Sequence, residues 1–174
     1  MARALKIAAA VLVSIAVIGA AGFGWWWYRG GMPGAEGVPL PAHVASALRA
    51  ADRFDLLALD PAPKKYYEFT GRTPPPGEDF HGYIALKRVT IADKEERQAL
   101  LAVLDAGIRE NRGMAAACFK PRHGISVATA NGSIGLVICF ECMQIKVHGA
   151  VSAEALTSGS PQKAFDAALA RPRG

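Results

Sequence analysis

The chain of 174 residues is long enough for one folded domain plus a terminal segment, and its 51% hydrophobic and 20% charged residues exclude a disordered or low-complexity protein. Three of its 20 basic residues, Arg3, Lys6 and Arg29, flank an uncharged N-terminal stretch, so the remaining 17 face 15 acidic residues. This near balance, without a Lys/Arg block interleaved with aromatic residues, argues against a nucleic-acid-binding surface. Three cysteines are too few for a miniprotein built on disulfides.

The N-terminus carries a candidate membrane segment at residues 7–28, a run of 22 residues without a charge. At about 1.5 Å per residue, a helix of this length crosses a hydrocarbon core of about 30 Å. The run ends in three tryptophans and a tyrosine before Arg29, which is typical of a helix end at the lipid–water interface. We therefore predict an uncleaved anchor. The alternative is a signal peptide with an apolar core at residues 7–18, cleaved at the small residues 19–21.

The basic residues Arg3 and Lys6 place residues 1–6 in the cytoplasm by the positive-inside rule. The sequence thus predicts a single-pass protein of the cell inner membrane, in contact with the lipid bilayer through residues 7–28. Everything after the anchor is predicted to be periplasmic or extracellular. Residues 29–43, rich in glycine and proline, are predicted as a linker, and residues 44–174 as one extracytoplasmic domain.

The first half of this domain alternates between short elements. Apolar residues at helical spacing indicate a short helix within residues 43–52. An apolar run at residues 54–59 predicts a strand that stops at Asp60-Pro61. Three consecutive prolines predict a surface loop at residues 71–79, and a strand follows at residues 80–91.

The clearest helix begins after Asp93. Asp93 and Glu96 have the spacing of a capping box, in which each side chain binds the backbone N–H of the other. Gly113 is predicted to end the helix in a left-handed conformation. One apolar stripe faces the core, formed by Leu100, Leu101, Leu104 and Ile108.

The second half of the domain carries mostly strand patterns. A short buried strand is predicted at residues 115–119, and extended structure resumes at residues 125–130. Asn131-Gly132 is typical of a type I′ hairpin turn, followed by a return strand at residues 133–148. A last helix is predicted from Ser160-Pro161 to Leu169. Together these elements predict an α+β fold, an antiparallel sheet covered on one face by helices.

The return strand changes phase, because its apolar residues lie at even positions up to Phe140 and at odd positions from Met143. A strict period of two cannot change phase, so we predict a β-bulge within residues 140–142. The hairpin register places Gly124 opposite Cys139 and Arg122 opposite Glu141. Six residues are therefore expected at one end of the sheet: Cys118, Arg122, His123, Cys139, Glu141 and Cys142.

Two motifs, Cys118-Phe-Lys-Pro-Arg-His-Gly124 and Ile138-Cys-Phe-Glu-Cys142, resemble a signature of small bacterial proteins, many of which carry an N-terminal export or anchor segment. The upstream Phe80-His-Gly-Tyr83 stretch and the helix that follows it are similar as well. The resemblance covers about residues 54–148. It implies no activity, because none is established for that group.

Structural roles for the Cys/His cluster are the favoured interpretation. Cysteines outside the cytoplasm tend to oxidise, so Cys118 is predicted to form a disulfide with Cys139 or Cys142. Arg122 and Glu141 would then form a cross-strand ion pair.

Three chemical interpretations stay open beside the structural one. Cys118, His123, Cys139 and Cys142 match the donor set of a Cys₃His zinc site. Cys139-x-x-Cys142 has the spacing of a thiol–disulfide exchanger, although it lies in a strand pattern instead of at a helix start. Cys118 with His123 as its base would form a nucleophilic pair.

Two functional hypotheses follow. The first is a non-enzymatic, membrane-anchored extracytoplasmic domain that acts as an accessory or binding module for an envelope protein, with a structural Cys/His cluster and no cofactor. The second is a zinc- or thiol-dependent envelope enzyme centred on Cys118, His123, Cys139 and Cys142. It requires a concave site around residues 121–124 and a reactive, partly exposed thiol.

Overall fold

The computed structural model describes residues 37–129, 132–150 and 152–171. The predicted anchor at residues 7–28 and the predicted turn residue Asn131 lie outside the described residues. Among the described residues, no helix is both long enough and apolar enough to cross a bilayer. The packed part begins inside the predicted linker, because Leu40 is buried in the core and the carbonyl of Val38 accepts a hydrogen bond from Leu156.

The described strands form one antiparallel sheet in the order β2-β3-β1-β4-β5-β6-β7. The central strand β1 pairs with β3 on one side and with β4 on the other. Residues 54–57, at the start of β1, are all buried, with Phe54 and Leu56 in the larger apolar cluster and Leu57 in the smaller one. The strands are β1 (Phe54–Pro63), β2 (Glu78–Phe80), β3 (Tyr83–Thr90), β4 (His123–Thr129), β5 (Gly132–Cys139), β6 (Gln144–His148) and β7 (Ala153–Leu156).

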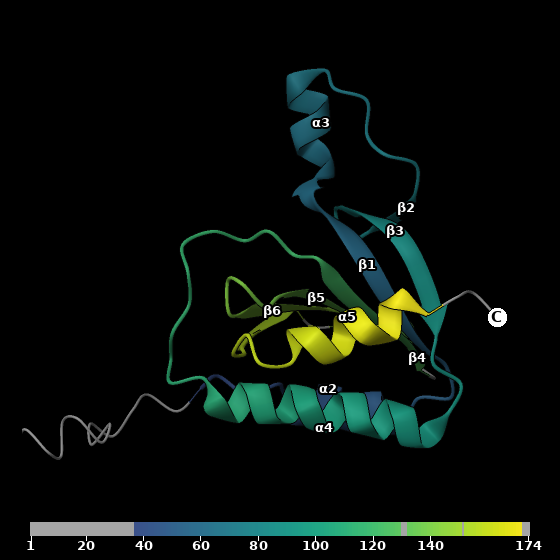
Figure 1. The fold of residues 1–174 in the computed structure, drawn as a ribbon, viewed down its shortest axis with the longest axis vertical. Coiled ribbons are helices and arrows are strands. Elements are labelled where there is room, and N and C mark those ends of the chain that lie inside the picture. The colour runs from purple at the N-terminus through teal and green to yellow at the C-terminus, as the bar shows by residue number, and fades with distance from the viewer. Residues whose placement is uncertain (1–36, 130–131, 151, 172–174) are drawn as a thin grey trace, which may run out of the picture. The chain divides into compact units, whose positions relative to one another are not determined.

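Three helices cover one face of the sheet: α2 (Ala42–Ala50), α4 (Lys94–Glu110) and α5 (Gln162–Ala170). Figure 1 shows α2 and α4 side by side, with α5 next to them against the strands. The largest fully buried side chains on this face include Phe54, Leu104 and Phe165. This arrangement confirms the predicted α+β class with an antiparallel sheet and covering helices.

The opposite face of the sheet carries a second, smaller apolar cluster, formed by Leu57, Leu59, Phe80, Ala85 and Val137. A fourth helix, α3 (Lys64–Thr70), continues directly from β1 and stands away from the other helices (Figure 1). It buries none of its own residues, and Phe69 is 92% exposed. The sequence analysis predicted neither α3 nor the continuation of β1 past Asp60-Pro61.

The structure confirms the start of α4 and its apolar stripe. The side chain of Asp93 accepts a hydrogen bond from the backbone N–H of Glu96 at 2.7 Å. Glu96 does not complete the capping box, because its carboxylate binds Arg171 instead. The helix ends earlier than predicted, at Glu110 with Asn111 as its C-cap, and Gly113 adopts its positive φ of 79° beyond that end.

The predicted bulge in one long return strand is wrong. Residues 140–143 form a turn that reverses the chain, so β5 and β6 are two paired strands, with Cys139 opposite Gln144. A reversal changes the phase of the apolar pattern just as a bulge does. Residues paired across β5 and β6, such as Cys139 and Gln144, lie on the same face although one number is odd and the other even. The strand predicted at residues 80–91 is also interrupted, because a turn at His81-Gly82, with φ of 51° and 86°, separates β2 from β3.

Two further expectations are corrected. The β4–β5 hairpin pairs Gly124 with Val137, two positions from the predicted partner Cys139. A shift of two leaves every side chain on its predicted face, because the period of a strand is two. Residues 115–119 form no strand and are mostly exposed. They belong to an extended loop from Arg112 to Arg122 that passes over the β5–β6 turn.

Candidate functional site

The β5–β6 turn is closed by a disulfide between Cys139 and Cys142, whose Cα atoms lie 5.1 Å apart. We call residues 139–143 the cysteine turn. Met143 closes the turn with a φ of 59°, and its N–H donates to the carbonyl of Phe140 at 3.1 Å. Both disulfide cysteines are only 1% exposed. This pairing differs from the predicted bridges, which joined Cys118 to one of these two residues.

Cys118 is the free cysteine, and it is exposed. Its Sγ lies 3.6 Å from the Sγ of Cys142. The loop that carries it is fixed to the turn by backbone bonds, because the N–H of Ala116 donates to the carbonyl of Cys142 at 3.0 Å. The side chain of Gln144 donates to the carbonyl of Cys118 at 3.3 Å. An exposed thiol is therefore held against a buried disulfide.

Backbone N–H groups also point at the two disulfide sulfurs. The N–H of Cys142 lies 3.2 Å from the Sγ of Cys139, and the N–H of Lys120 lies 3.3 Å from the Sγ of Cys142. Such donors stabilise a thiolate more than a disulfide sulfur, since a hydrogen bond to an ionised group is the stronger one. Each sulfur of the pair therefore has a donor ready for its reduced form.

His123 is buried beside the turn, with only 3% of its side chain exposed. Its Nε2 lies 2.9 Å from Oδ1 of Asp166 on α5, a partner that the sequence analysis did not identify. Burial lowers the pKa of His123, although the hydrogen bond and the charge of Asp166 oppose the shift. The ring also packs against Phe140 and Phe165 at centroid distances of 5.1 and 6.0 Å. His123 thereby joins β4 to α5.

Arg122 and Glu141 form the expected ion pair, with Nε and Oε1 3.7 Å apart and both side chains more than half exposed. It is not the predicted cross-strand pair, because Arg122 precedes β4 and Glu141 lies in the cysteine turn. The zinc set is not assembled. Among the described residues, no group of three or more His, Cys, Asp or Glu side chains has the arrangement of a metal site. The zinc interpretation stays a prediction.

The cysteine turn has no cavity beside it. The depression bounded by Lys120, His123, Phe140 and Glu141 contains no space that a water molecule could occupy. The described residues around this depression therefore form no enclosed space next to the sulfurs. The second functional hypothesis required such a site, together with an exposed thiol, and the described residues show only the thiol.

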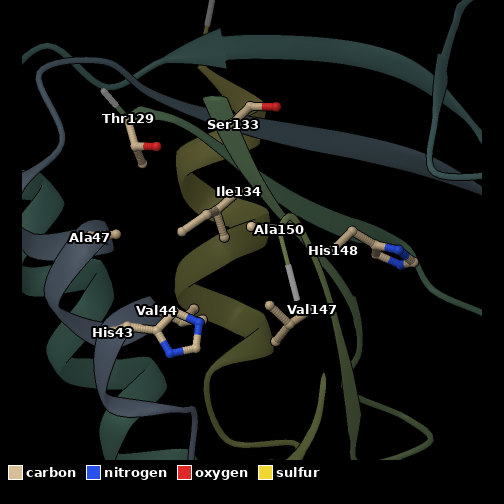
Figure 2. Close-up of a pocket in the computed structure, with 9 residues that line it drawn as sticks. All are labelled: His43, Val44, Ala47, Thr129, Ser133, Ile134, Val147, His148 and Ala150. Atoms are coloured by element: carbon tan, nitrogen blue, oxygen red, sulfur yellow. The ribbon is translucent and has the colours of Figure 1, made fainter. Parts of the chain in front are cut away.

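A hollow of about 230 Å³ lies at the other end of the β5–β6 hairpin. Figure 2 shows Val44 and Ala47 of α2 facing Ile134 and Val147 of the hairpin across this space. A neighbouring hollow of about 450 Å³ shares Ala47 with it and continues along α2. The sequence carried no signal for this space, because it forms between elements that are far apart in the chain.

The edge of the hollow carries polar groups. His43, Thr129 and Ser133 border it, and the described residues that line it include no carboxylate, lysine or arginine. His148 belongs to the wall, but its ring points away from the space (Figure 2) and stacks on His81 at a centroid distance of 4.3 Å. Burial lowers the pKa of both of these histidines.

No protein-family model, curated protein or solved structure matches this chain.

Proposed function

We propose that residues 37–171 are the extracytoplasmic binding module of a membrane-anchored protein, and that its ligand is a small apolar molecule or the end of an acyl chain. The observation that carries this proposal is the hollow between α2 and the open end of the β5–β6 hairpin. Ligand sites are concave, mostly apolar and supplied with a few polar groups that orient the ligand. The hollow has this character, whereas the cysteine turn has no such space.

The lining of the hollow selects the ligand class. Val44, Ala47, Ile134 and Val147 supply apolar contacts, while Thr129 and the imidazole of His43 lie at the edge. A ligand with an apolar body and one polar end satisfies both kinds of surface. About 230 Å³ fits a short chain or a single ring, and the neighbouring hollow of about 450 Å³ gives a longer chain room along α2.

The test is photolabelling of the full chain in lipid nanodiscs with an octanoate that carries a diazirine. We expect labels on peptides from α2 and from β5–β6. Ala47→Trp fills the hollow and should abolish these labels. The matched control is Ala102→Trp, at an exposed position of α4 outside the hollow. Labelling unchanged by Ala47→Trp, or reduced equally by both variants, would overturn the proposal.

The membrane anchor is part of the same proposal and rests on residues 7–28 and their aromatic end. We propose that the protein keeps this segment in the inner membrane, with residues 1–6 in the cytoplasm. The mass of the protein extracted from membranes should equal that of the uncleaved chain. A mass that begins after residues 19–21 would show cleavage and a released domain.

A further inference from the structure

We infer that the cysteine turn is a thiol–disulfide exchange site. Cys118 exchanges first with the buried Cys139–Cys142 disulfide and then with a dithiol of another protein. This activity is separate from ligand binding in the hollow. The contact that supports it is the 3.6 Å separation between the Cys118 and Cys142 sulfurs, with Cys118 exposed and the disulfide buried. A reagent in solution reaches Cys118 but not the disulfide.

The first step is internal. Cys118 loses its proton to solvent, and its thiolate attacks the Sγ of Cys142, because the thiolate is the nucleophile in such exchanges. A Cys118–Cys142 bond forms, the Cys139–Cys142 bond breaks, and Cys139 leaves as a thiolate. One disulfide replaces another, so no electrons are gained or lost. The result is a disulfide with one exposed sulfur.

The leaving group of this step is stabilised by the fold. The N–H of Cys142 lies 3.2 Å from the Sγ of Cys139 and can donate to the thiolate as it forms. A more stable leaving thiolate departs faster. Once it takes a proton from solvent, the Cys139 thiol can donate to the carbonyl of Lys120, which is 3.3 Å away.

The second step involves the partner. A thiolate of the partner attacks the exposed sulfur of Cys118, and Cys142 leaves as a thiolate that accepts the N–H of Lys120 at 3.3 Å. The second thiolate of the partner then attacks the mixed disulfide and releases Cys118. The partner dithiol has become a disulfide, and Cys139 and Cys142 have gained the two electrons and two protons. The reverse sequence would reduce a partner disulfide.

The surroundings favour a protein over a small substrate. No enclosed space adjoins the sulfurs, whereas the loop on either side of Cys118 is open to contact from outside, with Ala115 and Ala117 exposed and Met114 62% exposed. Exchange between proteins needs only that the two sulfurs meet. A cavity is therefore not required at this site.

The direct test is the rate at which dithiothreitol, as the probe dithiol, reduces the Cys139–Cys142 bond in the oxidised full chain in detergent micelles. Reduction is followed by timed alkylation and mass mapping. Cys118→Ser should slow reduction by about tenfold or more, since the buried pair then lacks its exposed relay thiol. The matched control, Ala117→Ser in the same exposed loop, should be reduced at the original rate. Equal rates for Cys118→Ser and the unaltered chain would overturn the inference.

A second variant tests the geometry independently. Cys139→Ser leaves Cys118 and Cys142 as the two thiols, and oxidised glutathione should join them into one intramolecular disulfide without change in the circular dichroism spectrum. The inference is wrong if Cys118 and Cys142 each accumulate as separate glutathione adducts instead.

Discussion

The two ends of the β5–β6 hairpin differ in their reactive groups and in the free space beside them. The closed end, at Cys139 and Gln144, holds three sulfur atoms in contact and no free space. The open end, at Ser133 and His148, borders a hollow of about 230 Å³ whose wall is mainly apolar. We propose covalent exchange with another protein at the closed end, and binding of a small ligand at the open end.

This difference shows why reactive residues and cavities need to be located separately in a small domain. The loop over the closed end is bonded to the turn through the N–H groups of Ala116 and Lys120, and its Phe119 packs on Tyr83 and Lys146. The open end is left unfilled because α2 contributes the small side chain of Ala47 where it faces the hairpin. Packing therefore determines the character of each end.

The largest expected effect comes from Phe165→Ala, which removes the aromatic support of the closed end. Phe165 is fully buried and packs on Phe140 at a centroid distance of 5.1 Å. Truncation should lower the free energy of unfolding by about 3–5 kcal/mol. Hydrogen exchange should rise more at residues 139–144 than at residues 133–135. Phe69→Ala, at a phenylalanine that is 92% exposed, is the control and should change neither quantity.

Removal of the disulfide should have the next largest effect. The bridge closes a short loop, with a sequence separation of 3, so the loss of chain constraint corresponds to about 2 kcal/mol of stability. We expect this loss in the double variant Cys139→Ser/Cys142→Ser, measured by denaturant unfolding. Cys118→Ser should leave stability within about 0.5 kcal/mol, because Cys118 is exposed. A similar loss in both variants would show that Cys118 belongs to the structural bridge.

Acid should weaken the domain, because burial lowers the pKa of His81, His123 and His148. Below the ordinary histidine pKa of about 6.5, the unfolded chain binds protons that the folded chain resists, so stability falls as pH falls. We expect a lower thermal unfolding temperature at about pH 5.5 than at about pH 7.5.

The contribution of His123 to the acid-induced loss of stability can be distinguished from those of the other two histidines, because His123 contacts Asp166. Asp166→Asn removes the charge that opposes the lowering of the His123 pKa, so the acid-induced loss of stability should become larger. His123→Gln should make it smaller. If Asp166→Asn instead reduces the acid-induced loss of stability, protonation of His123 does not destabilise the fold.

The smallest effect is expected for Arg122→Ala. The Arg122–Glu141 pair has a 3.7 Å separation, and both side chains are more than half exposed. Exposed pairs contribute about 0.2–1 kcal/mol, so unfolding and the rate of exchange at the sulfurs should change little. A loss above about 2 kcal/mol would mean that this pair, and not the disulfide, holds the closed end.

The sequence predicted the features that depend on local patterns. The cap of α4 at Asp93, its apolar stripe, the last helix and the antiparallel sheet follow from spacing and from turn residues. The phase change after Phe140 was correctly located, but it marked a reversal of the chain and not a bulge. A period-two pattern records the change of face without recording the direction of the chain.

The candidate sites could be predicted only in part for the same reason. Residue types and spacing predicted that Cys118, Cys139 and Cys142 lie at one end of the sheet. The structure places the sulfurs of Cys118 and Cys139 next to that of Cys142. The pairing depends on whether residues 140–143 turn back, which the pattern left open. Asp166 and the hollow depend on the packing of α5 and α2, which no local signal encodes.

The most direct test of this account is a disulfide map of the full chain, extracted from membranes without chelator and alkylated during extraction. We predict a mass equal to that of the reduced chain minus two hydrogens plus one alkyl group, with no metal adduct, a Cys139–Cys142 bridge in most molecules and the alkyl group on Cys118. Three alkylated thiols with bound zinc before denaturation, or a bridge to Cys118 in most molecules, would contradict it.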